Sequence, residues 1–140
     1  MTLEIIHIDA KRTYPPRVTA FTSTFWQGLS EGLLQSTRCQ SCAKLTFPPK
    51  PICPHCWGDK VAWETLSQEG TLYSWTRIHA GPAIFEAELP YEVGVVDLDA
   101  GIRLACRLHS ATATDWRCGM RVRIVTLDYQ DGPLFAASPA

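Results

Sequence analysis

The sequence predicts a mainly β protein in which one short N-terminal helix and a small cysteine-rich module precede a small β-barrel. Three observations lead to this prediction. Aromatic residues recur at helical spacing near residue 25, four cysteines gather between residues 39 and 56, and apolar and polar residues alternate between turn signals in residues 61–137. A chain of 140 residues can bury roughly two-thirds of its unfolded surface, so these parts can share a core.

The composition excludes several classes of protein. With 46% hydrophobic and 19% charged residues, the chain is neither disordered nor collagen-like. The 13 Lys and Arg residues balance the 14 Asp and Glu residues, and the net charge of -1 disfavours a nucleic-acid partner. No apolar run of about 18 residues predicts a membrane span, and the segment with Glu4 and Asp9 does not resemble a secretory signal. We therefore expect a cytoplasmic protein with no membrane partner.

The local patterns divide the chain into four segments. These are an extended arm, a helix with the lead-in strand of the next module, the cysteine module and the barrel, at residues 1–20, 21–37, 38–60 and 61–140. The arm is predicted to be extended because Pro15 and Pro16 disfavour a helix. Such an arm is held in place only where it packs on something.

The predicted helix covers residues 22–32. Phe21, Phe25 and Leu29 recur every four positions, which places them on one face, and Trp26 lies beside them. Three aromatic side chains on so short a helix need a surface to pack on. That surface is either the body of the protein or another chain, so the three aromatic residues are candidate docking residues.

The four clustered cysteines form two Cys-x-x-Cys turns, Cys39 with Cys42 and Cys53 with Cys56. Two facing turns supply four thiolates in a tetrahedron, the geometry of structural zinc, and a reducing cytosol disfavours disulfides. Four sulfur ligands leave no open position for a water molecule, so the metal would hold a zinc ribbon together rather than activate water. Iron at the same sulfurs and an empty site are the alternatives.

The rest of the chain predicts an all-β domain. Alternating segments lie between turns rich in Gly, Pro and Asp, at residues 70–79, 91–97, 102–109 and 121–128. About five short strands in this length fit a small closed barrel such as an OB-fold. A β-sandwich is the competing prediction.

Four arginines are candidate ligands for phosphate groups. Arg103 and Arg107 share one face of a predicted strand, and Arg121 and Arg123 share one face of a later strand. If these strands are neighbours, the barrel carries a basic stripe whose guanidinium groups could bind phosphates with two hydrogen bonds each. The alternative is an ordinary solvated strand face.

The loop with Ile84 and Phe85 is a second candidate contact surface. Exposed apolar residues at the rim of a barrel would mark an interaction site, whereas the same residues folded inward would belong to the core. Of the two remaining cysteines, Cys106 lies on an apolar strand face and Cys118 lies in a turn. No histidine is spaced to activate either thiol, so we expect no catalytic residue in this chain.

Several short motifs follow one another in a defined order: Phe25-Trp26, the two cysteine pairs with Phe47-Pro48-Pro49 between them, Gly70 to Ser74, Leu89-Pro90-Tyr91 and Gly101-Ile102-Arg103. In order and spacing, from Phe21 to Phe135, they resemble the DUF35 family. The resemblance implies a rubredoxin-like zinc ribbon followed by an OB-fold barrel, with Zn²⁺ bound by the four clustered cysteines. The arm before Phe21 lies outside the resemblance.

The resemblance also implies a role. DUF35 proteins are non-catalytic accessory subunits of thiolase-like or ketoacyl-synthase-like enzymes, and they help to hold acyl-CoA while the partner supplies the catalytic cysteine and histidine. On this interpretation the aromatic residues of the helix would dock the catalytic subunit. The loop at Ile84 and Phe85 and the four arginines would lie near the acyl-CoA.

Two other functions remain open from the sequence. A single-stranded nucleic-acid-binding module would use a basic groove and aromatic residues such as Tyr73 and Trp75 to stack on bases. A stand-alone enzyme would use Cys106 or Cys118 as its nucleophile.

Overall fold

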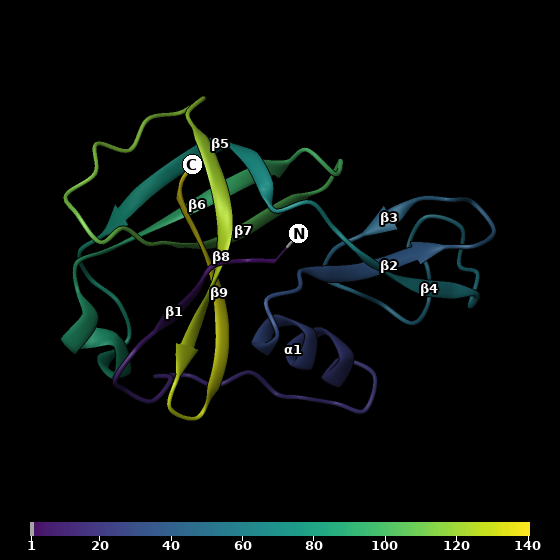
Figure 1. Ribbon diagram of the computed structural model, residues 1–140, viewed down its shortest axis with the longest axis horizontal. Helices are drawn as coiled ribbons and strands as arrows, with labels where there is room; N and C mark the ends of the chain where they lie inside the picture. Colours follow the sequence, from purple (N-terminus) through teal and green to yellow (C-terminus); the bar gives the residue numbers. More distant parts are fainter. Residues whose placement is uncertain (1) are drawn as a thin grey trace.

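The computed structural model describes residues 2–140, which form a zinc-ribbon module beside a β-barrel with one helix packed between them (Figure 1). The helix α1 (Ser23–Ser30) is slightly shorter than predicted. Its carboxyl end turns at Gly32, whose φ of 81° lies in the left-handed region that glycine adopts without strain. No helix in residues 2–140 has the length and apolar character needed to cross a membrane.

The ribbon is a three-stranded antiparallel sheet. Its strands β2 (Gln35–Cys39), β3 (Leu45–Thr46) and β4 (Val61–Thr65) lie in the order β3-β2-β4. Each of the five residues of β4 pairs with a residue of β2. The ribbon sheet therefore extends past residue 60, where the sequence placed the start of the barrel.

Five strands close into the barrel. They are β5 (Glu69–Ile78), β6 (Tyr91–Leu98), β7 (Arg103–Leu108), β8 (Arg121–Tyr129) and β9 (Gly132–Pro139). The order β8-β5-β6-β7-β9 closes because β8 also pairs with β9, and β7 runs parallel to β9. This closed arrangement confirms the OB-like barrel and excludes the sandwich. The four strands expected at residues 70–79, 91–97, 102–109 and 121–128 are all present.

The N-terminal arm is bound to the barrel over much of its length. Its strand β1 (Ile5–His7) pairs in parallel with the second half of β8, and β5 pairs with the first half of β8. The side chains of Ile6 and Ile8 pack against Val125 and Leu127 on the face of β8 that points away from the barrel interior. The arm thus covers an apolar surface that would otherwise face water, and this burial holds it in place.

Farther along, the arm contacts the turn between β8 and β9. The guanidinium of Arg12 donates hydrogen bonds to the backbone carbonyls of Asp131, at 2.7 Å, and Pro133, at 3.3 Å. The side chain of Gln130 donates to Asp9 at 2.7 Å. A short 3-10 helix, η1 (Ala83–Glu88), lies between β5 and β6, and its Glu88 accepts a hydrogen bond from the hydroxyl of Thr13.

The main core fills the barrel and continues under α1. Phe25 and Leu29 of the helix belong to the same cluster as Leu72, Val96 and other interior barrel residues. The buried hydroxyl of Thr126 in β8 donates a hydrogen bond of 2.9 Å to the carbonyl of Leu29 at the end of the helix. The helix is therefore fixed to the barrel by apolar packing and by one buried polar contact.

Candidate functional site

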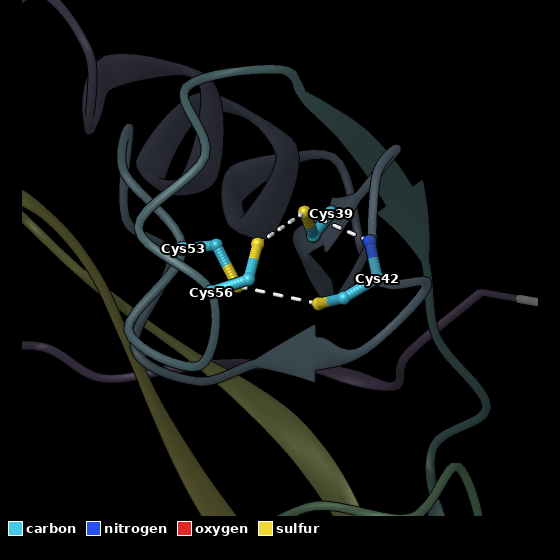
Figure 2. A group of neighbouring side chains, drawn as sticks. All are labelled: Cys39, Cys42, Cys53 and Cys56. Atoms are coloured by element: carbon cyan, nitrogen blue, oxygen red, sulfur yellow. Dashed lines mark hydrogen bonds between the residues drawn. The ribbon is translucent and has the colours of Figure 1, made fainter.

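The four clustered cysteines form one compact site, and Figure 2 shows their side chains pointing toward one another. Cys39 ends β2, and the other three lie in the turns that follow it. The sulfur atoms of Cys39 and Cys56 are 3.6 Å apart, as are those of Cys42 and Cys53. All four sulfurs lie within 4.8 Å of one another. A tetrahedron with metal–sulfur bonds of about 2.3 Å has edges of about 3.8 Å, so the four thiols fit a single metal ion.

Backbone N–H groups of both turns point at the sulfurs. Those of Ser41 and Cys42 lie 3.3 and 3.4 Å from the sulfur of Cys39, and that of His55 lies 3.4 Å from the sulfur of Cys53. The N–H of Cys42, followed by that of Ser41, lowers the pKa of Cys39 to about 6. These donors stabilise the thiolate, which is the form that binds a metal. The arrangement can therefore hold a metal with four sulfur ligands and no bound water.

The residue after each cysteine pair has an unusual backbone conformation. Ala43 and Trp57 have φ values of 62° and 65°, in the left-handed region that only glycine adopts freely. The N–H of Ala43 donates to the carbonyl of Cys39 at 3.0 Å, and that of Trp57 donates to the carbonyl of Cys53 at 2.8 Å. The two turns thus have the same backbone conformation and the same closing hydrogen bond, and in each the left-handed residue ends the turn.

Trp57 and Ile52 expose an apolar surface beside the cysteines. Their side chains are 81% and 50% exposed. The sequence analysis did not identify these two residues as a candidate surface. No glycine indicates the left-handed conformation at position 57, and single apolar residues in loops are common.

The predicted docking residues of the helix lie against the body of the protein. Phe25 is only 4% exposed and packs edge-on against Trp26, Phe47 and Phe135. Phe21 packs against Trp63 of β4 with ring centroids 5.1 Å apart. Of the three residues, Phe21 and Trp26 keep part of their surface accessible.

The four predicted phosphate-binding arginines do not form one stripe. The strand β9 lies between β7 and β8, so the condition of neighbouring strands is not met. Each guanidinium lies against a carboxylate, and the pairs are Arg103–Asp97 at 2.6 Å, Arg107–Glu88 at 3.0 Å, Arg121–Asp99 at 2.6 Å and Arg123–Glu4 at 3.0 Å. The sequence pattern could not reveal these partners, because they come from β6, from the turn that follows it, from η1 and from the arm.

Two of the predicted acyl-CoA contacts, Phe85 and Arg107, line one cavity of about 240 Å³. It lies where the arm, η1 and the barrel meet, and its walls are Thr13, Tyr14, Phe85, Glu88, Arg107, Leu127, Tyr129, Leu134 and Phe135. Ile84 does not line this cavity and is 55% exposed. The structure thus separates the predicted ligand residues, and Phe85 and Arg107 share this concave site.

The cysteines outside the cluster differ in environment. Burial raises the pKa of Cys106 to about 12, so its thiol stays protonated and unreactive at neutral pH. Cys118 is exposed in the loop before β8.

Comparison with known proteins agrees with this architecture. The ChsH2 rubredoxin-like zinc ribbon domain matches residues 26–62, and the ChsH2 C-terminal OB-fold domain matches residues 63–127. A DUF35 domain-containing scaffold protein of Methanocaldococcus jannaschii is 31% identical over 103 residues, which are 71% of this chain and 72% of that protein.

Two further matches concern proteins named as parts of enzymes. The benzoylsuccinyl-CoA thiolase subunit BbsA of Thauera aromatica is 30% identical over 119 residues, which are 83% of this chain and 81% of that subunit. A chain of the solved Ltp2-ChsH2(DUF35) aldolase has a TM-score of 0.76 and 27% identity, and the match covers 89% of this chain and 98% of that chain.

Proposed function

Since the chain belongs to the DUF35 family, whose members join a rubredoxin-like zinc ribbon to an OB-fold domain, we propose that it is a non-catalytic accessory subunit of an enzyme complex that acts on acyl-CoA thioesters. The observation that carries this proposal is the match to a thiolase subunit over 83% of this chain and 81% of that subunit. The similarity therefore spans both modules and is not confined to one of them.

The partner is a thiolase-like or ketoacyl-synthase-like enzyme that supplies the catalytic cysteine and histidine. The chemistry of this chain supports that division of work. The high pKa of Cys106 makes its thiol a poor nucleophile, and the four clustered cysteines are taken up by the metal. The name of the aldolase match adds a carbon–carbon-cleaving enzyme as a related class of partner.

The metal is Zn²⁺, bound by Cys39, Cys42, Cys53 and Cys56. A site of four thiolates with no space for water gives zinc a structural role. It fixes the two turns relative to each other and so presents the side chains of the ribbon as a rigid surface.

We assign docking of the catalytic subunit to apolar residues of the ribbon and the helix. Trp57 and Ile52 are the exposed members, and Phe21 and Trp26 add their accessible parts. Tryptophan contributes strongly to protein interfaces because its large side chain buries much apolar surface at little entropic cost. Phe25, buried in the core, positions Trp26 by packing against it.

Contact with acyl-CoA is a further part of the proposal. Ile84 and Phe85 of η1 would contact the apolar part of the ligand. The arginines would bind its phosphates through their remaining N–H groups, and the carboxylates that they already contact would weaken this attraction. Single-stranded nucleic-acid binding is less favoured for the same reason, because Arg103, which lies over the ring of Tyr73, is neutralised by Asp97.

The experiment is a purification of the tagged full-length chain from its native cells, with zinc measured in the same sample. The expected result is one Zn²⁺ per chain together with an acyl-CoA-processing enzyme in a fixed ratio, and that enzyme should lose activity when this subunit is removed. Trp57→Ala should reduce recovery of the enzyme without loss of zinc, whereas Tyr73→Ala, which truncates an exposed aromatic residue on the barrel, should not. A catalytic subunit that is fully active alone and does not bind this chain would overturn the proposal.

A further inference from the structure

The cavity between the arm, η1 and the barrel has the features of a small-molecule binding site. We propose that it binds a neutral molecule consisting of one apolar ring with a single oxygen acceptor, such as a ketone. Its walls come from the arm, η1, β7, β8 and β9, and the residues with polar groups are Thr13 and Tyr14 of the arm, Glu88 of η1, Arg107 of β7 and Tyr129 of β8. Sites of this kind are concave and mostly apolar, with a few converging polar groups.

The volume of the cavity limits the size of the ligand. It measures about 240 Å³, whereas an engineered cavity of about 150 Å³ in another protein holds one benzene molecule. The space here therefore accepts one ring with a substituent of two or three heavy atoms. Because the cavity is open to solvent on one side, a fused ring system or a long alkyl chain would leave part of the molecule outside it.

The electrostatics of the cavity favour a neutral ligand. Arg107 donates a hydrogen bond of 3.0 Å to one carboxylate oxygen of Glu88, and the other oxygen accepts from the hydroxyl of Thr13. The guanidinium also lies 3.9 Å from the ring centroid of Tyr91. Because the two opposite charges already compensate each other, the pair attracts an anion only weakly.

The hydroxyl of Tyr129 supplies the specific polar contact. Burial raises the pKa of Tyr129, so the group is a protonated donor at neutral pH. Tyr129 lines the same cavity as Arg107 and Glu88. Among residues 2–140 the buried side-chain polar atoms without a partner are Nε of Arg12 and of Arg123, so the Tyr129 hydroxyl is not an orphaned buried group. A carbonyl oxygen in the cavity would replace water as the acceptor of its hydrogen bond.

This inference does not depend on the proposed role in an acyl-CoA complex. Binding of a small ring compound is a property of the chain alone and can be measured without a partner. A chain that binds no ketone could still be an accessory subunit, and a chain that has no catalytic partner could still bind one.

The test is a titration of the isotopically labelled, zinc-loaded full chain with acetophenone, followed through its backbone amide resonances. The expected result is saturable shifts concentrated at Thr13, Phe85 and Tyr129. Ethylbenzene, which has nearly the same shape but lacks the oxygen, should bind about 5-fold more weakly. Benzoate should bind at least about 10-fold more weakly because of its charge, and 2-acetonaphthone, whose second ring would extend outside the cavity, should bind no more tightly than acetophenone.

Two variants separate the hydroxyl from the shape of the cavity. Tyr129→Phe should weaken acetophenone binding by about 5-fold and leave ethylbenzene binding unchanged, and Tyr73→Phe, on an exposed tyrosine outside the cavity, should change neither. Leu134→Phe narrows the cavity and should weaken both ligands. Equal effects of Tyr129→Phe on the two ligands, stronger binding of benzoate, or unsaturable shifts spread over the surface would each overturn the proposal.

Discussion

The guanidinium of Arg12 lies directly against the α-carbon of Gly132. A β-carbon at position 132 would come within 2.5 Å of one terminal nitrogen of that guanidinium and 2.7 Å of its central carbon. The φ of Gly132 is 143°, a value that residues with a side chain rarely adopt. This close approach is one of several contacts that join the N-terminal arm to the hairpin that closes the barrel, beside the hydrogen bonds of Arg12 and the pairing of β1 with β8.

The substitution Gly132→Ala should therefore lower the free energy of unfolding by about 2 to 3 kcal/mol. It strains the backbone and pushes Arg12 away from the carbonyls of Asp131 and Pro133. Urea denaturation measures the loss. Gly119→Ala is the control, because Gly119 also has a positive φ, of 91°, but no atom near its added β-carbon; it should cost only about 1 kcal/mol.

A double variant isolates the contact itself. If Arg12→Ala and Gly132→Ala act through the same hydrogen bonds, the combined loss of stability will be smaller than the sum of the two single losses. If the two losses of stability are strictly additive, Gly132→Ala does not destabilise the protein by displacing the Arg12 guanidinium.

Removal of the metal should unfold the ribbon selectively. The ribbon sheet has few buried apolar residues of its own, whereas the barrel encloses the main core. With a chelator, amide exchange should become fast in β2, β3 and β4 and stay slow in β6 and β8, because metal binding supplies much of the folding free energy of such modules. Cys53→Ser should abolish metal binding, and Cys118→Ser should not. Simultaneous unfolding of both parts would contradict this prediction.

The left-handed conformation of Trp57 predicts a conflict between stability and assembly. Trp57→Gly should stabilise the isolated chain by about 1 kcal/mol, since it relieves backbone strain and removes a side chain with few contacts. The same change should weaken binding of the catalytic subunit. Ala43→Gly relieves the equivalent strain in the other turn, so it should stabilise the chain similarly and leave binding unaltered. Chemical denaturation and affinity measurements on both variants test this prediction, and equal binding of the two variants would contradict it.

The buried hydrogen bond between α1 and the barrel can be tested with a nearly isosteric change. Thr126→Val removes the hydroxyl that donates to the carbonyl of Leu29 and leaves that buried acceptor without its partner. We expect a loss of about 1 to 2 kcal/mol in chemical denaturation. Thr112→Val, on an exposed loop residue, should change stability by less than about 0.5 kcal/mol.

Acid should weaken the outer face of the barrel. Arg121 donates hydrogen bonds to both carboxylate oxygens of Asp99 and holds the pKa of that carboxyl below its usual value of 3.8. A depressed folded-state pKa adds stability above the unfolded pKa, and this stability is lost as the pH falls through the folded value. The difference in stability between pH 6 and pH 3 should therefore be smaller in Asp99→Asn than in the natural chain. An unchanged difference would mean that the ion pair does not act on folding.

The sequence predicted the parts that depend on local patterns. The four alternating strands were found because one face of each meets the barrel core, and the cysteine pairs define their own turns. The strand β9 was not identified, since its Ala136, Ala137 and Ser138 have weak β propensity. The arm was expected to be extended, but its pairing with β8 could not be foreseen, because that pairing joins opposite ends of the chain.

One signal for the arm was present in β8. Its residues Ile124 and Val125 are both fully buried, although neighbours in a strand point to opposite faces. Such an interrupted alternation indicates a strand covered on both sides, and here the second cover is the arm. Whether the four arginines form one stripe was not predictable from single strands. The charge pattern of one strand does not show which strands become its neighbours, nor which carboxylates lie beside its arginines.

The position of β1 on the second half of β8 has a consequence for biosynthesis. Ile5 pairs with Thr126, so β1 can find its partner only after β8, which lies far downstream in the chain, has been synthesised. Contacts between residues so distant in sequence form slowly. Before β1 pairs with β8, the unpaired edge of β8 and the apolar side chains of Ile6 and Ile8 are exposed and can bind other chains. The structure therefore predicts that molecules in which β1 has not yet paired with β8 associate with one another more readily than completed ones.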